Sequence, residues 1–522
     1  MRRLRVLLVL SLALAPPAPA LAGPTVASAA GRFDGIAQGG VESFLGVPYA
    51  APPVGPRRWR APQPAPAWPG VREAQRFGPA CAQGIAGAWG PYSAEFIAQP
   101  PVSEDCLTLN LWKSAAARRN LPVLVFVHGG AFQGGAGSLP VYDGGSLAAR
   151  GAVVITINYR VGVFGFFAHP ALTAESPDRT SGNYGLLDQR AALRWVRANV
   201  ARFGGDPANV TLAGESAGAA SVNDLLISPK AQGLFARAVS FSGPSMAVHV
   251  GSLAEGERDG MDLAAKLGAT DLAAVRALPM ERLIDASRVV PVAGGGPPRL
   301  VWRPHRDGAL LPYDPTTPDG PLAVRVPLLG GFNAAEMLDT SITTPAAFER
   351  AVQTRYGAFA ERLLALYPHH TDAEVARSNV LVGRDRTMAG LLLWSRARAR
   401  ASGQAIYGYL YDHAYPPVRG GTAYGAFHSS ELPYVFGALD HGDRAFTAAD
   451  RATSRQWQDR LLAFMRTGDP SLKTSRWPRI APGAMQLMGL GDKPGMRAAV
   501  STPARFAVFR DYAAAGGNLG LM

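Results

Sequence analysis

A serine between two glycines is the first feature of this sequence with a clear chemical use, in the pentapeptide GESAG at residues 214–218. The apolar segment 210–214 precedes this serine as a short strand, and residues 216–227 can continue as a helix. A serine at such a strand-to-helix turn is held exposed, and the start of the helix directs main-chain N–H groups at a nearby negative charge. The pattern predicts Ser216 as a nucleophile, with an ordinary glycine-rich turn as the alternative.

A second glycine-rich turn lies upstream, where His128, Gly129 and Gly130 follow the apolar run 121–127. Glycine lets main-chain N–H groups approach a substrate oxygen without a side chain in between. Histidine followed by glycines after a strand is typical of loops that bind the oxyanion of a tetrahedral intermediate. A plain turn between a strand and a helix is the alternative.

A nucleophilic serine needs a base, and the sequence contains nine histidines. In hydrolases with such a turn the acid and then the base follow the nucleophile along the chain. If the acid follows the apolar run at 326–330, this order leaves five histidines, which are His369, His370, His413, His428 and His441. The local pattern alone favours His413, because it stands at the end of the apolar run 406–411.

The segments that would position these groups alternate between strand and helix patterns. Continuous apolar runs are typical of strands buried on both faces of a parallel sheet. They occur at residues 121–127, 152–158, 210–214, 239–242, 326–330 and 406–411. Residues 185–203 carry apolar side chains at helical spacing. We expect an α/β fold with a mostly parallel central sheet flanked by helices, and a less regular insert from about residue 246 to 325 that forms a helical cap or insert.

Composition excludes several classes of protein. A chain of 522 residues with 48% hydrophobic residues is not disordered as a whole. The formal charge is +13, but the basic residues are spread along the chain without a stripe of interleaved aromatics, so we expect no nucleic-acid partner. The two cysteines, Cys81 and Cys106, are far apart in sequence with no histidine near them, which argues against a zinc site.

The first 22 residues have the pattern of an export signal. Three arginines among residues 1–5 precede an apolar run at 6–15 that is too short to span a bilayer, and the small residues at 20–22 suit cleavage after Ala22. No later stretch reaches 18 apolar residues. We therefore expect one domain at 23–522 that is periplasmic or secreted, with no stable membrane insertion and with Cys81 paired to Cys106. Two buried free thiols are the alternative.

Six blocks in order along the chain resemble the type-B carboxylesterase family of α/β-hydrolases, which includes the cholinesterases. They are FLGVPYAAPP at 44–53, SEDCLTLN at 103–110, NYRVG at 158–162, GNYGLLDQ at 182–189, FGGDP at 203–207 and GESAG at 214–218. The likeness is dense over residues 31–245 and continues in shorter blocks over 326–437. Residues 246–325 match nothing.

The resemblance implies the rest of a catalytic triad. The block GFNAAE at 331–336 places Glu336 as the acid, with Asp339 as the runner-up, although Met337 stands where the family usually has glycine. The block GAFHSSELPYVFG at 425–437 favours His428 as the base over His413. The resemblance also implies an oxyanion hole formed by the N–H groups of Gly130, Ala131 and Ala217. It implies a disulfide between Cys81 and Cys106, and ion pairs Arg58–Glu104 and Arg160–Asp188, solvent-exposed charges being the alternative.

The implied activity is hydrolysis of small-molecule carboxylic esters through an acyl-enzyme on Ser216, without metal or cofactor. Amides, carbamates and thioesters are alternative substrates, and a catalytically silent binding protein on the same fold is the alternative class. Phe96 stands where cholinesterases have a tryptophan that faces choline, which argues against a choline esterase. Phe132, Phe164 and Phe166 line an acyl pocket or belong to the core. The sequence carries no signal for an oligomeric state.

Overall fold

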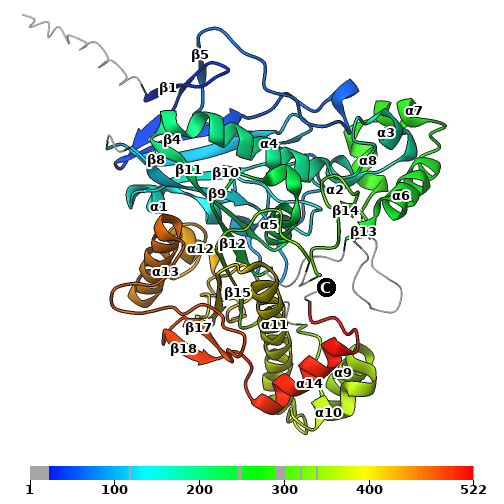
Figure 1. Ribbon diagram of the computed structural model, residues 1–522, viewed down its shortest axis with the longest axis vertical. Helices are drawn as coiled ribbons and strands as arrows, with labels where there is room; N and C mark the ends of the chain where they lie inside the picture. Colours follow the sequence, from blue (N-terminus) through cyan, green and yellow to red (C-terminus); the bar gives the residue numbers. More distant parts are fainter. Residues whose placement is uncertain are drawn as a thin grey trace, which may run out of the picture.

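The computed structural model describes residues 23–116, 119–243, 250–288, 300–317, 320–336 and 339–520, and the expected export signal lies outside them. Its centre is an eleven-stranded sheet with the strand order β18-β17-β16-β15-β12-β11-β9-β10-β8-β4-β3 (Figure 1). In chain order these strands are β3 (Ile36–Gln38), β4 (Val41–Pro48), β8 (Thr108–Ser114), β9 (Leu121–Val127), β10 (Val153–Ile157), β11 (Gly205–Glu215), β12 (Arg237–Phe241), β15 (Leu328–Asn333), β16 (Ile406–Tyr411), β17 (Gln486–Leu490) and β18 (Gly495–Ala498). The expected α/β fold with a mostly parallel sheet is confirmed.

The middle of the sheet is parallel and its two edges are antiparallel. Every neighbouring pair from β17 to β10 is parallel, whereas β8, β4, β3 and β18 pair antiparallel. Strands β3 and β4 are joined by Gly39 and Gly40, with φ of 58° and 78°. Two residues with positive φ form the kind of tight turn that matches the twist of a hairpin, which explains two glycines there.

Each face of the sheet carries its own hydrophobic core. In β9, Val123, Val125 and Val127 join one core, and the alternate residues Leu124 and Phe126 join the other. The first core includes side chains of α4 (Tyr184–Asn199), α5 (Ala217–Ile227) and α11 (Asp372–Ser402). The second includes those of α1 (Gly145–Ala149), α12 (Leu432–Phe436) and α13 (Ala448–Thr467). Burial on both faces is why these strands read as unbroken apolar runs.

The insert contains short helices, as expected. Helices α6 (Leu253–Lys266), α7 (Leu272–Ala277) and α8 (Met280–Ala286) lie together beside α3 (Pro170–Glu175) in Figure 1. Arg58 donates from Nη1 to the carbonyls of Arg276 and Leu278 at 2.8 and 2.7 Å, which ties this group to the N-terminal part of the chain. At the opposite end of α11 from the sheet, α9 (Pro345–Tyr356), α10 (Ala360–Leu364) and α14 (Pro503–Ala514) form a second group (Figure 1).

Both expected ion pairs are present and little exposed. Arg160 donates from Nε and Nη2 to the two carboxylate oxygens of Asp188, each at 2.7 Å, and Arg58 pairs in the same two-pronged way with Glu104. A disulfide joins Cys81 to Cys106. No helix in the described part of the chain is long and apolar enough to cross a membrane.

Candidate active site

The turn between β11 and α5 holds Ser216 in a strained conformation. Its φ of 56° and ψ of −120° lie where a residue with a side chain is rarely found, at a cost of about 1–3 kcal/mol. The glycines on both sides are required by space. A Cβ on Gly214 would lie 2.2 Å from the carbonyl oxygen of Gly218, and a Cβ on Gly218 would lie 2.0 Å from that of Val127. The turn is therefore as tight as the GESAG pattern predicts.

A glycine-containing loop at residues 129–135, called here the glycine loop, follows β9 and lies beside Ser216 in the lining of one cavity. Its peptide groups are oriented by hydrogen bonds on their carbonyl sides. The Gly129 carbonyl lies 2.8 Å from Nδ1 of His128, and the Gly130 carbonyl accepts from the N–H groups of Gln133 and Gly134 at 2.9 and 3.1 Å. In a trans peptide the N–H points opposite to the carbonyl, so the N–H groups of Gly130 and Ala131 point the other way.

The N–H of Ala217 is also oriented by a hydrogen bond on the carbonyl side of its peptide group. The Ser216 carbonyl accepts from the N–H of Ala220 at 2.9 Å as the first turn of α5 begins, which turns the Ala217 N–H toward the start of the helix. The structure thus brings the three residues expected to form an oxyanion hole to one place around Ser216.

The His128 ring is held in one tautomer by its contact with the glycine loop. Burial lowers the pKa of this histidine to about 4, so the ring is neutral at pH 7. Because the Gly129 carbonyl can only accept, Nδ1 must carry the ring proton, and the ring stacks on Tyr159 with 4.4 Å between centroids. The Tyr159 hydroxyl donates to the His128 carbonyl at 3.0 Å, which is a second contact between these two residues.

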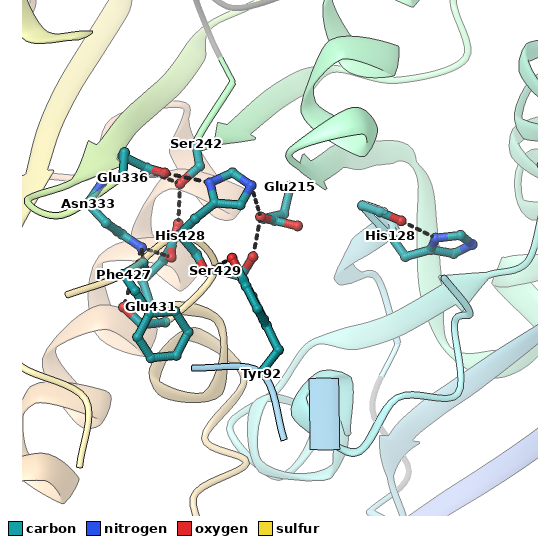
Figure 2. Close-up of polar contacts among 12 residues, drawn as sticks. Tyr92, His128, Glu215, Ser242, Asn333, Glu336, Phe427, His428, Ser429 and Glu431 are labelled. Atoms are coloured by element: carbon teal, nitrogen blue, oxygen red, sulfur yellow. Dashed lines mark hydrogen bonds and ion pairs between the residues drawn. The ribbon is translucent and has the colours of Figure 1, made fainter. Parts of the chain in front are cut away.

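His428 lies between two buried carboxylates (Figure 2). Its Nδ1 is 2.5 Å from Oε2 of Glu336, and its Nε2 is 3.2 Å from Oε1 of Glu215. Burial by itself would lower the pKa of His428, but the carboxylates of Glu336 and Glu215 outweigh it and raise the pKa to about 9. The ring is therefore an imidazolium at pH 7 in this arrangement.

The carboxylate of Glu336 is held by three groups, which are His428, Ser242 and Asn333. Its Oε1 accepts from the Ser242 hydroxyl at 2.5 Å and from the N–H of Asn333 at 2.8 Å. Glu336 follows β15 at the carboxyl edge of the sheet, where sites of α/β proteins form. With both of its oxygens engaged, this carboxylate keeps one orientation toward the imidazole ring.

A third buried glutamate, Glu431, completes the polar cluster. Its Oε1 lies 3.1 Å from the Ser242 oxygen, whose one proton goes to Glu336, and the Asn333 amide donates to its Oε2. Burial and the neighbouring carboxylates of Glu336 and Glu215 raise the pKa of Glu431 to about 8, so it is mostly protonated at pH 7. Burial also raises the pKa of Glu215, and the charge of the neighbouring His428 ring opposes that rise.

A cavity of about 410 Å³ opens in front of Ser216, and His428, Glu215 and the glycine loop line it. The far wall comes from the segment closed by the disulfide, with the side chains of Gln83, Ile85, Trp89, Tyr92, Phe96 and Ile97. Trp89 and Tyr92 pack with 4.5 Å between ring centroids. No lysine or arginine of the described residues lines the cavity, and its lining is aromatic on one side with the His428–Glu215 pair on the other.

The alternative candidates lie elsewhere. His413 contacts two carboxylates, Asp450 at 2.8 Å and Asp492 at 2.5 Å, and does not line the cavity. Asp339 accepts from the hydroxyl and N–H of Ser341 in a local turn. Phe132, Phe164 and Phe166 are buried in the core and do not line the cavity either, whereas Phe96 does. Met337 lies outside the described residues.

Four polar residues of the site were missed in the sequence: Gln83, Glu215, Ser242 and Glu431. Glu215 stood beside the candidate nucleophile and could have been found there as an ionisable group within the turn. Ser242 and Glu431 are 189 residues apart and meet only through the fold. Among the described residues no three histidine, cysteine or acidic side chains gather as a metal site.

The fold and this arrangement define an α/β-hydrolase. The sequence matches the carboxylesterase family over residues 22–506, and the chain belongs to that family, the type-B carboxylesterases. It is 35% identical over 491 residues to a fumonisin B1 esterase of Sphingopyxis macrogoltabida, covering 89% of this chain and 86% of the relative. It is 35% identical over 477 residues to a para-nitrobenzyl esterase of Bacillus subtilis, covering 86% and 91%.

A solved structure of a PNB esterase superposes with a TM-score of 0.75 at 32% sequence identity, over 93% of this chain and 99% of that one. The resemblance seen in the sequence blocks is confirmed. The chain is an enzyme, a carboxylesterase of this family that acts on small-molecule substrates.

Proposed function

We propose that this carboxylesterase hydrolyses esters through an acyl-enzyme on Ser216, with His428 as general base and Glu336 as the acid that orients it. The bond between His428 and Glu336 at the cavity wall carries the proposal, because it occupies Nδ1 and makes Nε2, now 3.2 Å from Glu215, the nitrogen that would exchange protons with Ser216 and substrate. Ser216 and His428 line the same cavity, and the hydrogen bond between the Ser216 hydroxyl and Nε2 is part of the proposal.

In the first half of the reaction the Ser216 oxygen bonds to the ester carbonyl carbon, and its proton passes to Nε2 of His428. The carbonyl oxygen becomes an oxyanion, which accepts hydrogen bonds from the N–H groups of Gly130, Ala131 and Ala217. The bond to the alcohol oxygen then breaks, and that oxygen takes the proton from Nε2. Water repeats the sequence on the acyl-enzyme and releases the acid.

The cavity favours substrates with a neutral, apolar or aromatic body. Its wall offers the rings of Trp89, Tyr92 and Phe96, and its charged groups are His428 and Glu215, which contact each other. A substrate carboxylate would meet no lysine or arginine of the described lining, and the charge of His428 is already paired with Glu336 and Glu215. Neutral p-nitrophenyl esters should therefore be hydrolysed faster than esters of the same length that end in a carboxylate.

A phosphonate or fluorophosphate ester tests the nucleophile, because it forms a tetrahedral adduct with an activated serine alone. Intact mass should rise by one adduct, and peptide mapping should place it on Ser216. Ser216→Ala should abolish labelling and lower ester turnover by several orders of magnitude. An adduct on another serine, or full turnover by the alanine variant, contradicts the proposal. Matched p-nitroanilides in the same assay separate esterase from amidase activity.

We further propose that the chain is exported and cleaved after Ala22. The disulfide in the structure supports this, since disulfides persist in oxidising compartments. The mature protein recovered outside the cytoplasm should begin at Gly23 and take up no thiol reagent when denatured without a reductant. A retained N-terminus or two reactive thiols per chain would argue against export.

A further inference from the structure

Gln83 is a buried amide that connects the disulfide to the glycine loop. The residue is 6% exposed and stands two positions after Cys81. Its Nε2 donates to the Gly135 carbonyl at 2.8 Å and to the Cys81 carbonyl at 2.9 Å. Its Oε1 accepts from the Gly135 N–H at 2.8 Å. One side chain thus satisfies both main-chain groups of Gly135, much as a neighbouring strand would.

Gly135 in turn lies against the peptide groups that face Ser216. A Cβ on Gly135 would be 2.4 Å from Nδ1 of His128 and 2.5 Å from the Gly129 carbonyl oxygen, so the glycine packs directly on both. Its neighbour Gly134 donates to the Gly130 carbonyl. Movement of Gly134 and Gly135 would therefore change the direction of the Gly130 and Ala131 N–H groups.

We propose that Gln83 is a positioning residue for the oxyanion hole, and this inference rests on the proposed function of the glycine loop. The amide holds Gly135, Gly135 packs on His128 and Gly129, and the N–H groups of Gly130 and Ala131 are fixed before substrate arrives. Such fixed donors lower the barrier because they need no reorganisation when negative charge develops on the carbonyl oxygen. The anchor of the amide is Cys81, so the disulfide supports the loop as well as the cavity wall.

The test is Gln83→Met, which keeps the length and volume of the side chain but removes its donor and its acceptor. We expect kcat for p-nitrophenyl butyrate to fall about 10–100-fold, because a displacement of up to 1 Å at a reacting centre can cost about 100-fold. KM should stay within about twofold of wild type, since ground-state binding relies on the aromatic wall. Amide hydrogen exchange at residues 134–135 should become faster in the variant, which reports the loop independently of activity.

Gln99→Met is the matched control. Gln99 lies in the same disulfide-closed segment, is exposed, does not line the cavity, and its amide donates only to the Ile97 carbonyl at 3.0 Å. This variant should leave kcat, KM and the exchange at residues 134–135 as in wild type. A kcat for Gln83→Met within twofold of wild type, or unchanged exchange, overturns the inference. Ser216→Ala, assayed alongside, separates that outcome from failure of the proposed function, which would show as retained turnover.

Discussion

Replacing Glu215 by glutamine should move the pH profile of ester hydrolysis toward acid. The base must be neutral to accept a proton, so kcat/KM rises with pH through the pKa of His428. In the wild-type protein that pKa is about 9, compared with an ordinary value of 6.5, which corresponds to about 3 kcal/mol in favour of the imidazolium. At pH 7 only about one ring in a hundred is neutral in this arrangement.

Glu215 is one of two carboxylates in contact with the ring, at 3.2 Å from Nε2. An opposite charge at such a distance usually changes a pKa by about 1–3 units, so the ascending limb of Glu215→Gln should lie about 1–2 pH units lower. The plateau rate should fall as well, because the imidazolium formed in the transition state loses one of its two stabilising charges.

The measurement is kcat/KM for a neutral p-nitrophenyl ester between pH 5 and pH 10, corrected for spontaneous hydrolysis. Glu431→Gln is the control, because Glu431 is mostly protonated at pH 7 and does not contact the ring, so its limb should move less. An ascending limb of Glu215→Gln at the wild-type position or at higher pH would refute the reasoning. The same shift predicts that the free energy of unfolding falls as pH rises from about 6.5 to 9, since the folded ring loses its favourable charge.

Two further variant pairs test other parts of the site. His428→Ala should remove nearly all ester turnover, whereas His413→Ala should keep most of it. The His413 variant should lower the free energy of unfolding by about 1–3 kcal/mol, because Asp450 and Asp492 each lose a hydrogen bond. Turnover lost in the His413 variant and kept in the His428 variant would reverse the choice of base. Gly218→Ala should lower the free energy of unfolding in urea by about 3 kcal/mol or more, because its Cβ would meet the Val127 carbonyl at 2.0 Å. Gly383 lies in α11 with open space where its Cβ would be, so Gly383→Ala should raise the free energy of unfolding by about 0.5–1 kcal/mol. Equal effects of the two glycine substitutions would show that the steric argument is wrong.

The centre of the sheet could be predicted from sequence because its strands are buried on both faces. Residues 121–127 form β9 with the expected bounds, and the runs at 152–158 and 406–411 become β10 and β16 with at most a residue of difference at either end. The antiparallel edges were missed. The segment of β4 is only partly buried along its length, so its apolar residues do not form a continuous run.

The polar cluster behind the candidate triad could not be predicted, because it depends on contacts between distant segments. Ser242 follows one strand and Glu431 lies beside α12. Nothing local in either segment indicates that Ser242 contacts both Glu336 and Glu431. His413 shows that a local pattern can also favour a residue that lies outside the site. It stands at a strand end as a catalytic base would, yet it binds two carboxylates away from the cavity. The family resemblance was needed to choose His428.

The disulfide-closed segment has a consequence for how this esterase can change. Its ends are fixed by a covalent bond, and the cost of closing a flexible loop grows only with the logarithm of its length, by about 0.6 kcal/mol for each doubling. Insertions and substitutions near Trp89 can therefore reshape the cavity at little cost in stability, while the reacting groups stay on the sheet and its turns. Gln83 is the exception, because its side chain lines the cavity and also binds Gly135 of the glycine loop, so its replacement would disturb both.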